Sequence, residues 1–415
     1  MELKRVVVTG FGAITPIGNN AKEYWENLIK GESGAAPITL FDSTNFKTKF
    51  ACEVKNFNAL NYFDKKEAKK MDRNSQFGQI AAREAIAHSR LIEDEVNKDR
   101  VGVIWGSGIG GLETFETEVL GWAASNNIPR FNPFFIPKMI ADITPGNISI
   151  EYGFHGPNYT TVSACASSAN ALIDAKMLIN LGKADVIVCG GSEAAVTASG
   201  MGGFNAMHAL STRNDDPKTA SRPFDKDRDG FVLGEGAGCI ILEEYEHAKK
   251  RGATIYAELA GGGMSADAHH MTAPHPEGLG AYLVMKNCLE DAGVTADEVD
   301  HINMHGTSTP LGDIAESNAI ARLFGEHAFD IQINSTKSMT GHLLGAAGVI
   351  EAIAALHTII HGIVPPTINH FTDDENIDSR LNFTFNSAVE KNVDIAMSNT
   401  FGFGGHNACV LFKKI

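Results

Sequence analysis

The chain has 415 residues, enough for two average domains or one large duplicated domain. Its 43% hydrophobic and 20% charged content is typical of a globular protein, and no apolar run approaches the roughly 20 residues of a membrane span. The formal net charge of −15 disfavours general binding to nucleic acid or to an anionic membrane, so an acidic partner would have to meet a local basic patch.

Cysteine usage and the start of the chain indicate the compartment. The six cysteines are scattered and form no CxxC pair, which argues against a zinc site or a disulfide scaffold and fits a reducing cytosol. The first ten residues enter a strand directly and lack a signal-peptide pattern. We therefore expect a cytoplasmic protein without a metal site.

The first predicted elements are a strand at residues 5–8, which ends in Gly10-Phe11-Gly12, and a helix at 20–28 with Asn20 as its N-cap. A helical region follows at 63–89. Its beginning carries the densest basic cluster of this acidic chain, which consists of Lys65, Lys66, Lys69, Lys70 and Arg73. The pattern fits a docking surface and a solvated helix face equally well.

A strand at 101–105 is followed by Gly106-Ser107-Gly108-Ile109-Gly110-Gly111, formally a G-x-G-x-x-G motif. A dinucleotide site needs an acidic residue about 20 positions further on. Residues 124–127 read Ala-Ser-Asn-Asn, so we reject that interpretation. We expect these glycines to let backbone pass close to a packed centre.

Tyr159–Val162 is a β-branched and aromatic run that favours a strand, and a helix of small residues follows from Ser163. Cys165 lies at this junction, where unpaired N–H groups and the helix dipole favour a thiolate nucleophile. The alternative is an inert core cysteine, because free cysteine is often buried. A strand at 185–191 completes a βαβ unit with parallel strands.

The pattern of elements begins again after residue 254. A strand at 238–243 and a helix at 246–251 close the first half. The second half is predicted to contain strands at 255–259, 302–304, 331–333 and 409–412 and helices at 278–292, 312–324 and 343–361. The halves share no clear sequence identity, so a division into 1–253 and 254–415 rests on element order alone.

Three further segments place polar, reactive residues beside strands or small-residue helices. They are 303–313 with His305, 334–348 with Lys337 and His342, and the glycine-rich 399–407. Ligands of open α/β sheets collect at the carboxyl ends of strands. A single histidine is more often structural, and the other thirteen, including His269, His270 and His275, stay unassigned. A cysteine with two histidines, however, suits thiol acyl chemistry, which needs a nucleophile and donors for an oxyanion.

Together these four segments resemble the active-site motifs of the β-ketoacyl-acyl-carrier-protein synthases, the condensing enzymes of fatty-acid synthesis, and most closely their elongating type II members. The similarity runs from Val6 to Phe412. It implies an α/β thiolase-like fold with two pseudo-symmetric halves in a five-layered αβαβα arrangement, and a homodimer. It also implies no cofactor beyond the phosphopantetheine of an acyl carrier protein, the expected partner.

The resemblance implies a role for each matching residue. Cys165 matches the acyl-carrying nucleophile, and His305 and His342 match the histidines that hydrogen-bond the malonyl thioester. Lys337 and Glu351 match an ion pair, and Phe403 matches the aromatic gate whose N–H joins that of Cys165 in the oxyanion hole. The pantetheine contacts match Thr307, Thr309 and Thr272, and a residue lining the acyl pocket matches Ile109. The carrier protein is expected to dock on Lys65, Lys66, Lys69, Lys70, Arg73 and Arg213.

The chain departs from the family pattern at two places. His406 stands where the family more often has threonine, and Ala166-Ser167-Ser168 replaces the commoner Thr-Ser-Gly. The second change leaves acyl-chain length open. The alternatives are a ketosynthase of a polyketide or aryl-polyene pathway, a thiolase acting on acyl-coenzyme A, and a non-catalytic chain-length partner. A thiolase would need a second cysteine near the carboxyl end, and a chain-length partner would lack Cys165.

Overall fold

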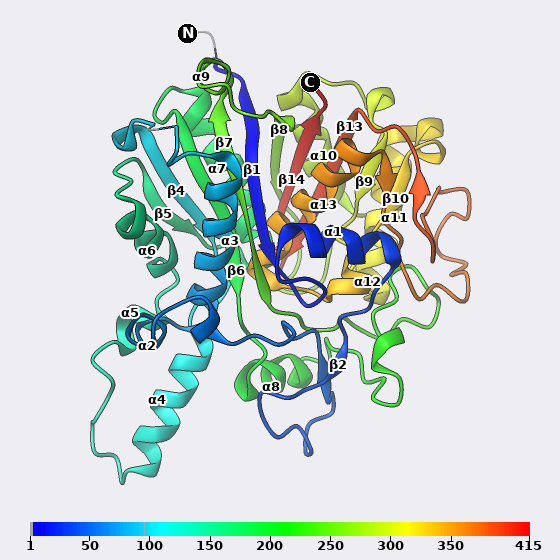
Figure 1. Ribbon diagram of the computed structural model, residues 1–415. Helices are drawn as coiled ribbons and strands as arrows, with labels where there is room; N and C mark the ends of the chain where they lie inside the picture. Colours follow the sequence, from blue (N-terminus) through cyan, green and yellow to red (C-terminus); the bar gives the residue numbers. More distant parts are fainter. Residues whose placement is uncertain (1–2, 95) are drawn as a thin grey trace.

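The structure is a computed structural model that describes residues 3–94 and 96–415 (Figure 1). Ten strands of the described chain form one sheet in the order β10-β9-β13-β14-β8-β1-β7-β6-β4-β5, and two short strand pairs lie outside it. The strands are β1 (Val6–Ile14), β2 (Ala36–Pro37), β3 (Phe50–Ala51), β4 (Val101–Gly106), β5 (Asn158–Thr161), β6 (Val186–Glu193), β7 (Gly236–Glu244), β8 (Ala257–Ala266), β9 (His301–Asn303), β10 (Gln332–Asn334), β11 (Ile363–Val364), β12 (Val389–Glu390), β13 (Ile395–Gly402) and β14 (His406–Lys413).

The helices alternate with the strands along most of the chain. They are α1 (Ala21–Lys30), α2 (Lys65–Lys70), α3 (Arg73–Ser89), α4 (Leu112–Ala124), α5 (Phe135–Met139), α6 (Ile143–Tyr152), α7 (Ser167–Asn180), α8 (Ala198–Ala206), α9 (Tyr245–Lys250), α10 (Leu279–Ala292), α11 (Pro310–Phe324), α12 (Lys337–Thr340) and α13 (Ala347–His361). Single 3₁₀ turns lie at Ala59–Asn61, Lys98–Arg100, Ala164–Ala166, Pro217–Thr219, Ala296–Glu298, Gly325–Phe329 and Leu344–Ala346.

The sheet consists of two halves with the same strand order. From the outer edge inward, β5-β4-β6-β7-β1 corresponds to β10-β9-β13-β14-β8. In each half the outer three strands are parallel and the next two pairings are antiparallel. The halves meet where Val7 and Val8 of β1 pair with Glu258 and Ala257 of β8. The matching order and direction confirm the predicted pseudo-symmetry, which no local sequence similarity reveals.

Five layers follow from how the helices pack. α3 covers one face of the first half through β1 and β7, and α10 covers the second half through β8 and β14. Between the halves, α7 and α13 pack against each other and against strands of both halves of the sheet. Their contact is close: a Cβ on Gly348 would lie 2.7 Å from the backbone nitrogen of Ala169. This αβαβα arrangement confirms the predicted fold class.

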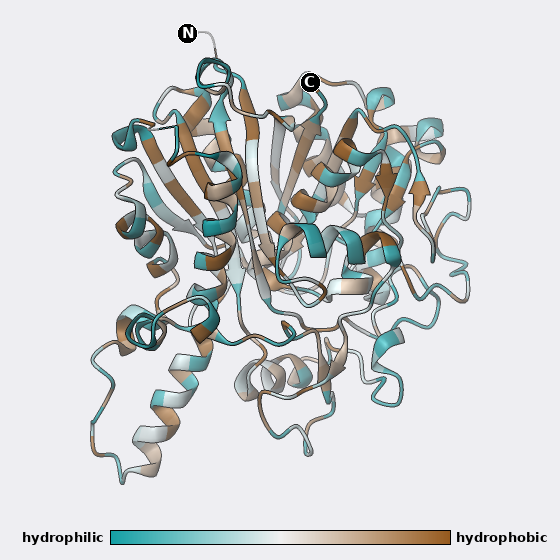
Figure 2. Ribbon diagram, viewed as in Figure 1, coloured by the Kyte–Doolittle hydropathy of each residue, from teal (hydrophilic) through white to brown (hydrophobic). Residues whose placement is uncertain are grey.

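The central helix α13 is largely apolar, with few polar side chains such as Glu351, because it is enclosed. The segment Leu344–His361 is long and apolar enough to cross a membrane by length and composition, yet 89% of it is buried inside the fold. Hydrophobic residues also fill the strands on both sides of it (Figure 2). A helix that is hydrophobic all round is typical of a protein core, and here it separates the two halves.

Local signals explain several element boundaries. Asn20 caps α1, and its side chain accepts a hydrogen bond of 2.8 Å from the backbone N–H of Glu23. The helical region predicted at 63–89 is two helices, because Asp72 caps a second one. The first strand does not end at Gly10–Gly12 but continues to Ile14. The glycines allow α3 to pack closely on β1, since a Cβ on Gly12 would lie 2.3 Å from the carbonyl oxygen of Ala81.

Candidate active site

Cys165 lies in the 3₁₀ turn between β5 and α7, as its place in the sequence suggests. The turn is tight: Ala164 adopts φ +51°, a left-handed conformation that L residues seldom take. Ser167 closes it by donating a hydrogen bond of 2.6 Å to the carbonyl oxygen of Ala164. The result is a buried sulfur, Sγ, that lies 3.0 Å from Nε2 of His342.

The protonation state of Cys165 differs from the sequence-based expectation. Burial raises the pKa of its thiol to about 12, although the charge of Lys337 and a hydrogen bond from the backbone N–H of Phe403 act in the opposite direction. The expected thiolate is therefore wrong for the resting site, because desolvation outweighs the favourable charges. The thiol must lose its proton as it reacts, and Nε2 of His342 is the nearest acceptor.

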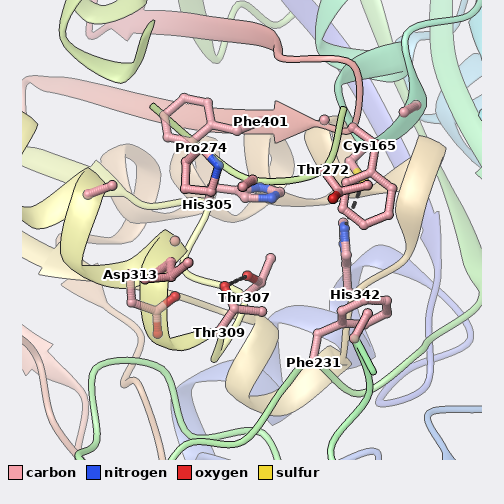
Figure 3. Close-up of a pocket in the computed structure, with 18 of the residues that line it drawn as sticks. Cys165, Phe231, Thr272, Pro274, His305, Thr307, Thr309, Asp313, His342 and Phe401 are labelled. Carbon is pink, nitrogen blue, oxygen red and sulfur yellow. Dashed lines mark hydrogen bonds between the residues drawn. The ribbon is translucent and has the colours of Figure 1, made fainter. Parts of the chain in front are cut away.

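Two histidines face the same space from different elements of the second half (Figure 3). His305 follows β9 and His342 follows α12, and their ring centroids lie 5.3 Å apart. Burial and the nearby charge of Lys337 hold both pKa values well below 6.5. Both imidazoles are therefore neutral at neutral pH, so each can donate one N–H to a substrate oxygen.

Lys337 and Glu351 form a buried ion pair, and the charge of Lys337 acts on both histidines. Burial raises the pKa of the Glu351 carboxyl to about 7, while the Lys337 charge lowers it. A charge in this position needs its partner, because removal of one side leaves the other buried and uncompensated.

Breaking this pair is expected to destabilise the fold. Glu351→Gln, which leaves the Lys337 ammonium unpaired, should lower the free energy of unfolding by about 3–5 kcal/mol. Lys337→Met/Glu351→Leu, which removes both charges, should recover most of the loss. Denaturant unfolding of the three proteins at pH 7.5 measures this. Equal stability of the single and double variants would contradict the role of the pair.

One cavity of about 540 Å³ connects Cys165 with the two histidines, whereas Lys337 and Glu351 are not among its lining residues. Residues of both halves line it, and among them are eight of the residues predicted from the sequence: Cys165, His305, His342, Thr272, Thr307, Thr309, Ile109 and Phe403. The hydroxyls of Thr307 and Thr309 lie 2.9 Å apart. The cavity therefore combines a nucleophile, two neutral hydrogen-bond donors and a pair of hydroxyls.

The predicted docking residues do not form one surface. Lys65, Lys66, Lys69 and Lys70 are exposed on α2. The guanidinium of Arg73 binds both carboxylate oxygens of buried Glu235, at 2.9 and 2.5 Å. An ion pair within the fold thus holds the Arg73 guanidinium, and its docking role stays a prediction. Arg213 is half-buried and donates to the carbonyl oxygen of Asp227.

Sequence reasoning missed two buried glutamates beside the cavity. Glu316 of α11 accepts hydrogen bonds from the backbone N–H groups of His305 and Gly306, at 2.9 and 3.0 Å, and so holds the histidine loop. Glu193 at the end of β6 accepts hydrogen bonds from the loop Gly106–Gly111. The only available signal was an acidic residue at the end of an apolar strand or within a small-residue helix.

No group of three or more His, Cys, Asp or Glu side chains in residues 3–94 and 96–415 is arranged to hold a metal ion.

Comparison with known proteins gives a consistent result. Residues 3–248 match the family described as "Beta-ketoacyl synthase, N-terminal domain", and residues 256–371 match "Beta-ketoacyl synthase, C-terminal domain". A "3-oxoacyl-[acyl-carrier-protein] synthase 2" of Synechocystis sp. is 49% identical, with 100% of this chain and 99% of the relative covered. A protein of the same name from Coxiella burnetii is 48% identical, with both chains covered completely.

Solved structures agree with the sequence relatives. A beta-ketoacyl synthase from Burkholderia phymatum superposes with a TM-score of 0.92 at 35% identity, covering 99% of this chain and 100% of the other. A type II polyketide ketosynthase, solved in complex with its acyl-carrier protein, superposes with a TM-score of 0.91 at 33% identity over the full length of both chains. The chain belongs to the beta-ketoacyl synthase family.

Proposed function

We propose that this protein is an acyltransferase that condenses an acyl chain, carried on Cys165, with malonyl-acyl-carrier protein, giving a β-ketoacyl-acyl-carrier protein and CO2. The observation that carries the proposal is that a buried thiol and two neutral imidazoles share one cavity. This set provides a nucleophile and hydrogen-bond donors without a net positive charge on the imidazoles. We expect no cofactor other than the phosphopantetheine arm that carries both substrates.

In the first step the sulfur of Cys165 bonds to the acyl carbon of the incoming thioester. Its proton passes to His342 and then to the departing pantetheine thiol. The carbonyl oxygen becomes an oxyanion, and the backbone N–H groups of Cys165 and Phe403 are the donors we assign to it. Each such donor is worth roughly 3 kcal/mol in the transition state. The low dielectric of the buried site strengthens these bonds.

In the second step the malonyl group loses CO2, and the electron pair of the broken bond forms an enolate. His305 and His342 donate N–H groups to the enolate oxygen, and Thr307 and Thr309 hold the pantetheine arm. The carbanion attacks the acyl carbon on Cys165, and the sulfur leaves as a thiolate. The thiolate then takes up one proton from solvent, which balances the proton that left with the pantetheine thiol in the first step. Neutral donors suit this step because an imidazolium would protonate the carbanion.

The pathway that fits best is fatty-acid elongation. The relatives at 48–49% identity are named "3-oxoacyl-[acyl-carrier-protein] synthase 2", whereas the type II polyketide ketosynthase is 33% identical. Incubation with a panel of acyl carriers plus malonyl carrier, analysed by mass spectrometry, tests this. Elongation of simple acyl chains by two carbons supports the proposal. Condensation only with acetyl-coenzyme A would instead identify a thiolase.

The acidic carrier protein is proposed to dock on the exposed lysines of α2. Lys65→Glu/Lys69→Glu should raise the KM for carrier-protein substrates about tenfold and flatten its salt dependence, because two rim attractions become repulsions. The kcat should stay near the wild-type value. The matched control is Lys249→Glu/Lys250→Glu, on α9 at the opposite end of the molecule (Figure 1). If the control shifts KM as much as the α2 variant, the docking site lies elsewhere.

We further propose a cytoplasmic homodimer. β5 is the last strand of its half and leaves one edge unpaired in the described chain. The residues around it are apolar and open: Ile150 is 81% and Val162 64% exposed. Helix α4, which projects from the body, adds exposed Phe115, Leu120 and Trp122. An exposed edge strand within an apolar patch is typical of an interface. Light scattering should give twice the mass of one 44.4 kDa chain.

A further inference from the structure

The carboxylate of Glu193 is the centre of a second, unassigned arrangement beside the cavity. It is fully buried. Its oxygens accept hydrogen bonds from the backbone N–H groups of Gly108 (2.7 Å), Ile109 (3.2 Å) and Gly110 (3.3 Å). A fourth backbone N–H, that of Gly345, donates from the second half at 3.0 Å. The reaction steps described above do not use this group.

The glycine motif therefore surrounds a carboxyl group that belongs to the protein itself. Successive backbone N–H groups form concave sites of the kind that bind phosphates, and here a carboxylate occupies one. Ser107 adds its hydroxyl, which lies 3.3 Å from the carboxylate and also accepts the N–H of Gly110. None of the hydrogen bonds to the Glu193 carboxyl within the described chain comes from a cationic side chain. Burial raises the pKa of this carboxyl to about 7, and the backbone N–H groups act in the opposite direction by stabilising its ionised form.

The loop held in this way is a wall of the cavity. Gly108 and Ile109 line it beside Ala164 and Cys165. The packing leaves no slack, since a Cβ on Gly345 would lie 2.3 Å from the backbone nitrogen of Gly108 and 2.6 Å from a carboxylate oxygen of Glu193. One carboxylate thus sets the distance between the wall next to the nucleophile and the turn that begins at Leu344.

The two histidines on the malonyl side of the cavity are held by hydrogen bonds that do not involve Glu193. His305 is held by Glu316. The backbone N–H of His342 donates to Val232 at 2.7 Å, and its carbonyl oxygen accepts from Gly234 at 2.9 Å. Loss of the Glu193 contacts would therefore loosen the wall next to the acyl chain and leave both histidines anchored.

We propose that Glu193 is a positioning residue for acyl transfer: it holds the Gly108–Ile109 wall where an acyl chain must lie to present its carbonyl to Cys165. This inference rests on the proposed function and names the residue that shapes the acyl side of the site. It requires a carboxylate, because a glutamine amide has a single acceptor oxygen and would turn its NH2 towards N–H donors.

The test separates the two half-reactions. Single-turnover acylation of Cys165 by acyl-carrier proteins of increasing chain length is followed by intact-protein mass spectrometry in wild type and Glu193→Gln. Malonyl decarboxylation is measured in Cys165→Gln with and without Glu193→Gln.

In Glu193→Gln the rate of Cys165 acylation should fall about 10- to 100-fold, most for long chains, because small misplacement of reacting groups is costly. Decarboxylation should stay within about threefold, since the histidine anchors are intact.

An equal loss in both half-reactions would mean a general structural role and would overturn the inference, as would unchanged acylation. If Glu193→Gln fails to fold, Ser107→Ala decides the matter, since it removes one hydroxyl from the same carboxylate. It should show the same selective loss on a smaller scale, and an unselective or absent loss would again overturn the inference. A wild-type enzyme that is never acylated at Cys165 would instead refute the proposed function itself.

Discussion

Replacing Cys165 with alanine should reduce condensation by about 10⁴-fold or more, because Cys165 is the only thiol among the residues that line the cavity. The fold should persist, since alanine fits the space of the thiol and the turn is held by Ser167. Acylation measured by intact-protein mass should disappear. The matched control is Cys239→Ala, which changes a buried cysteine of β7 outside the cavity and should remain active.

Cys165→Gln extends the same test. Its side-chain carbonyl would lie near the place of the acyl thioester, so the site should resemble the acylated enzyme. We expect no condensation but continued release of CO2 from malonyl-carrier protein. Condensation by either Cys165 variant would show that the sulfur is not the nucleophile, and the proposed mechanism would be wrong.

The second large effect concerns the two neutral histidines. His305→Asn and His342→Asn should each lower the decarboxylation rate by about 10²- to 10³-fold, because each removes a preorganised donor to the enolate oxygen. The double variant should be little worse than either single variant, since the two donors act as a unit. His327→Asn, a half-buried histidine of the 3₁₀ turn Gly325–Phe329, is the control and should leave the rate unchanged. Decarboxylation by the double variant at the wild-type rate would contradict the assignment.

The same histidines should affect stability in acid. Their pKa values are held well below 6.5 in the fold, so below pH 6.5 the unfolded chain binds more protons than the folded one. The contribution of each histidine to the free energy of unfolding has its full value above pH 6.5. It falls as the pH drops below 6.5, by up to about 1.4 kcal/mol per pH unit. Unfolding of His305→Asn relative to wild type at pH 7.5 and 5.5 isolates this term, because the buried glutamates are common to both proteins. A difference that does not change with pH would mean that the fold does not lower the pKa of His305.

Much of this protein can be predicted from local sequence signals. The order of strands and helices, the Asn20 cap and the reactive residue types all follow from patterns within about ten residues. The tandem βαβ order indicated two related halves, although the first strand continued further and one predicted helix proved to be two. These features are local because propensity, capping and periodicity act over short distances along the chain.

The protonation states and pairings were decided by the tertiary structure alone. Cys165 and His342 are 177 positions apart in the chain, and their contact at 3.0 Å exists only because α7 and α13 meet at the centre of the fold. Burial there makes the thiol neutral, against the expectation from a helix N-terminus. Likewise the guanidinium of Arg73 forms an ion pair with Glu235, and the backbone N–H groups of the glycine loop bind the carboxyl of Glu193 instead of a phosphate. Desolvation and long-range contacts depend on which surfaces the fold brings together, and no local pattern in the sequence records that.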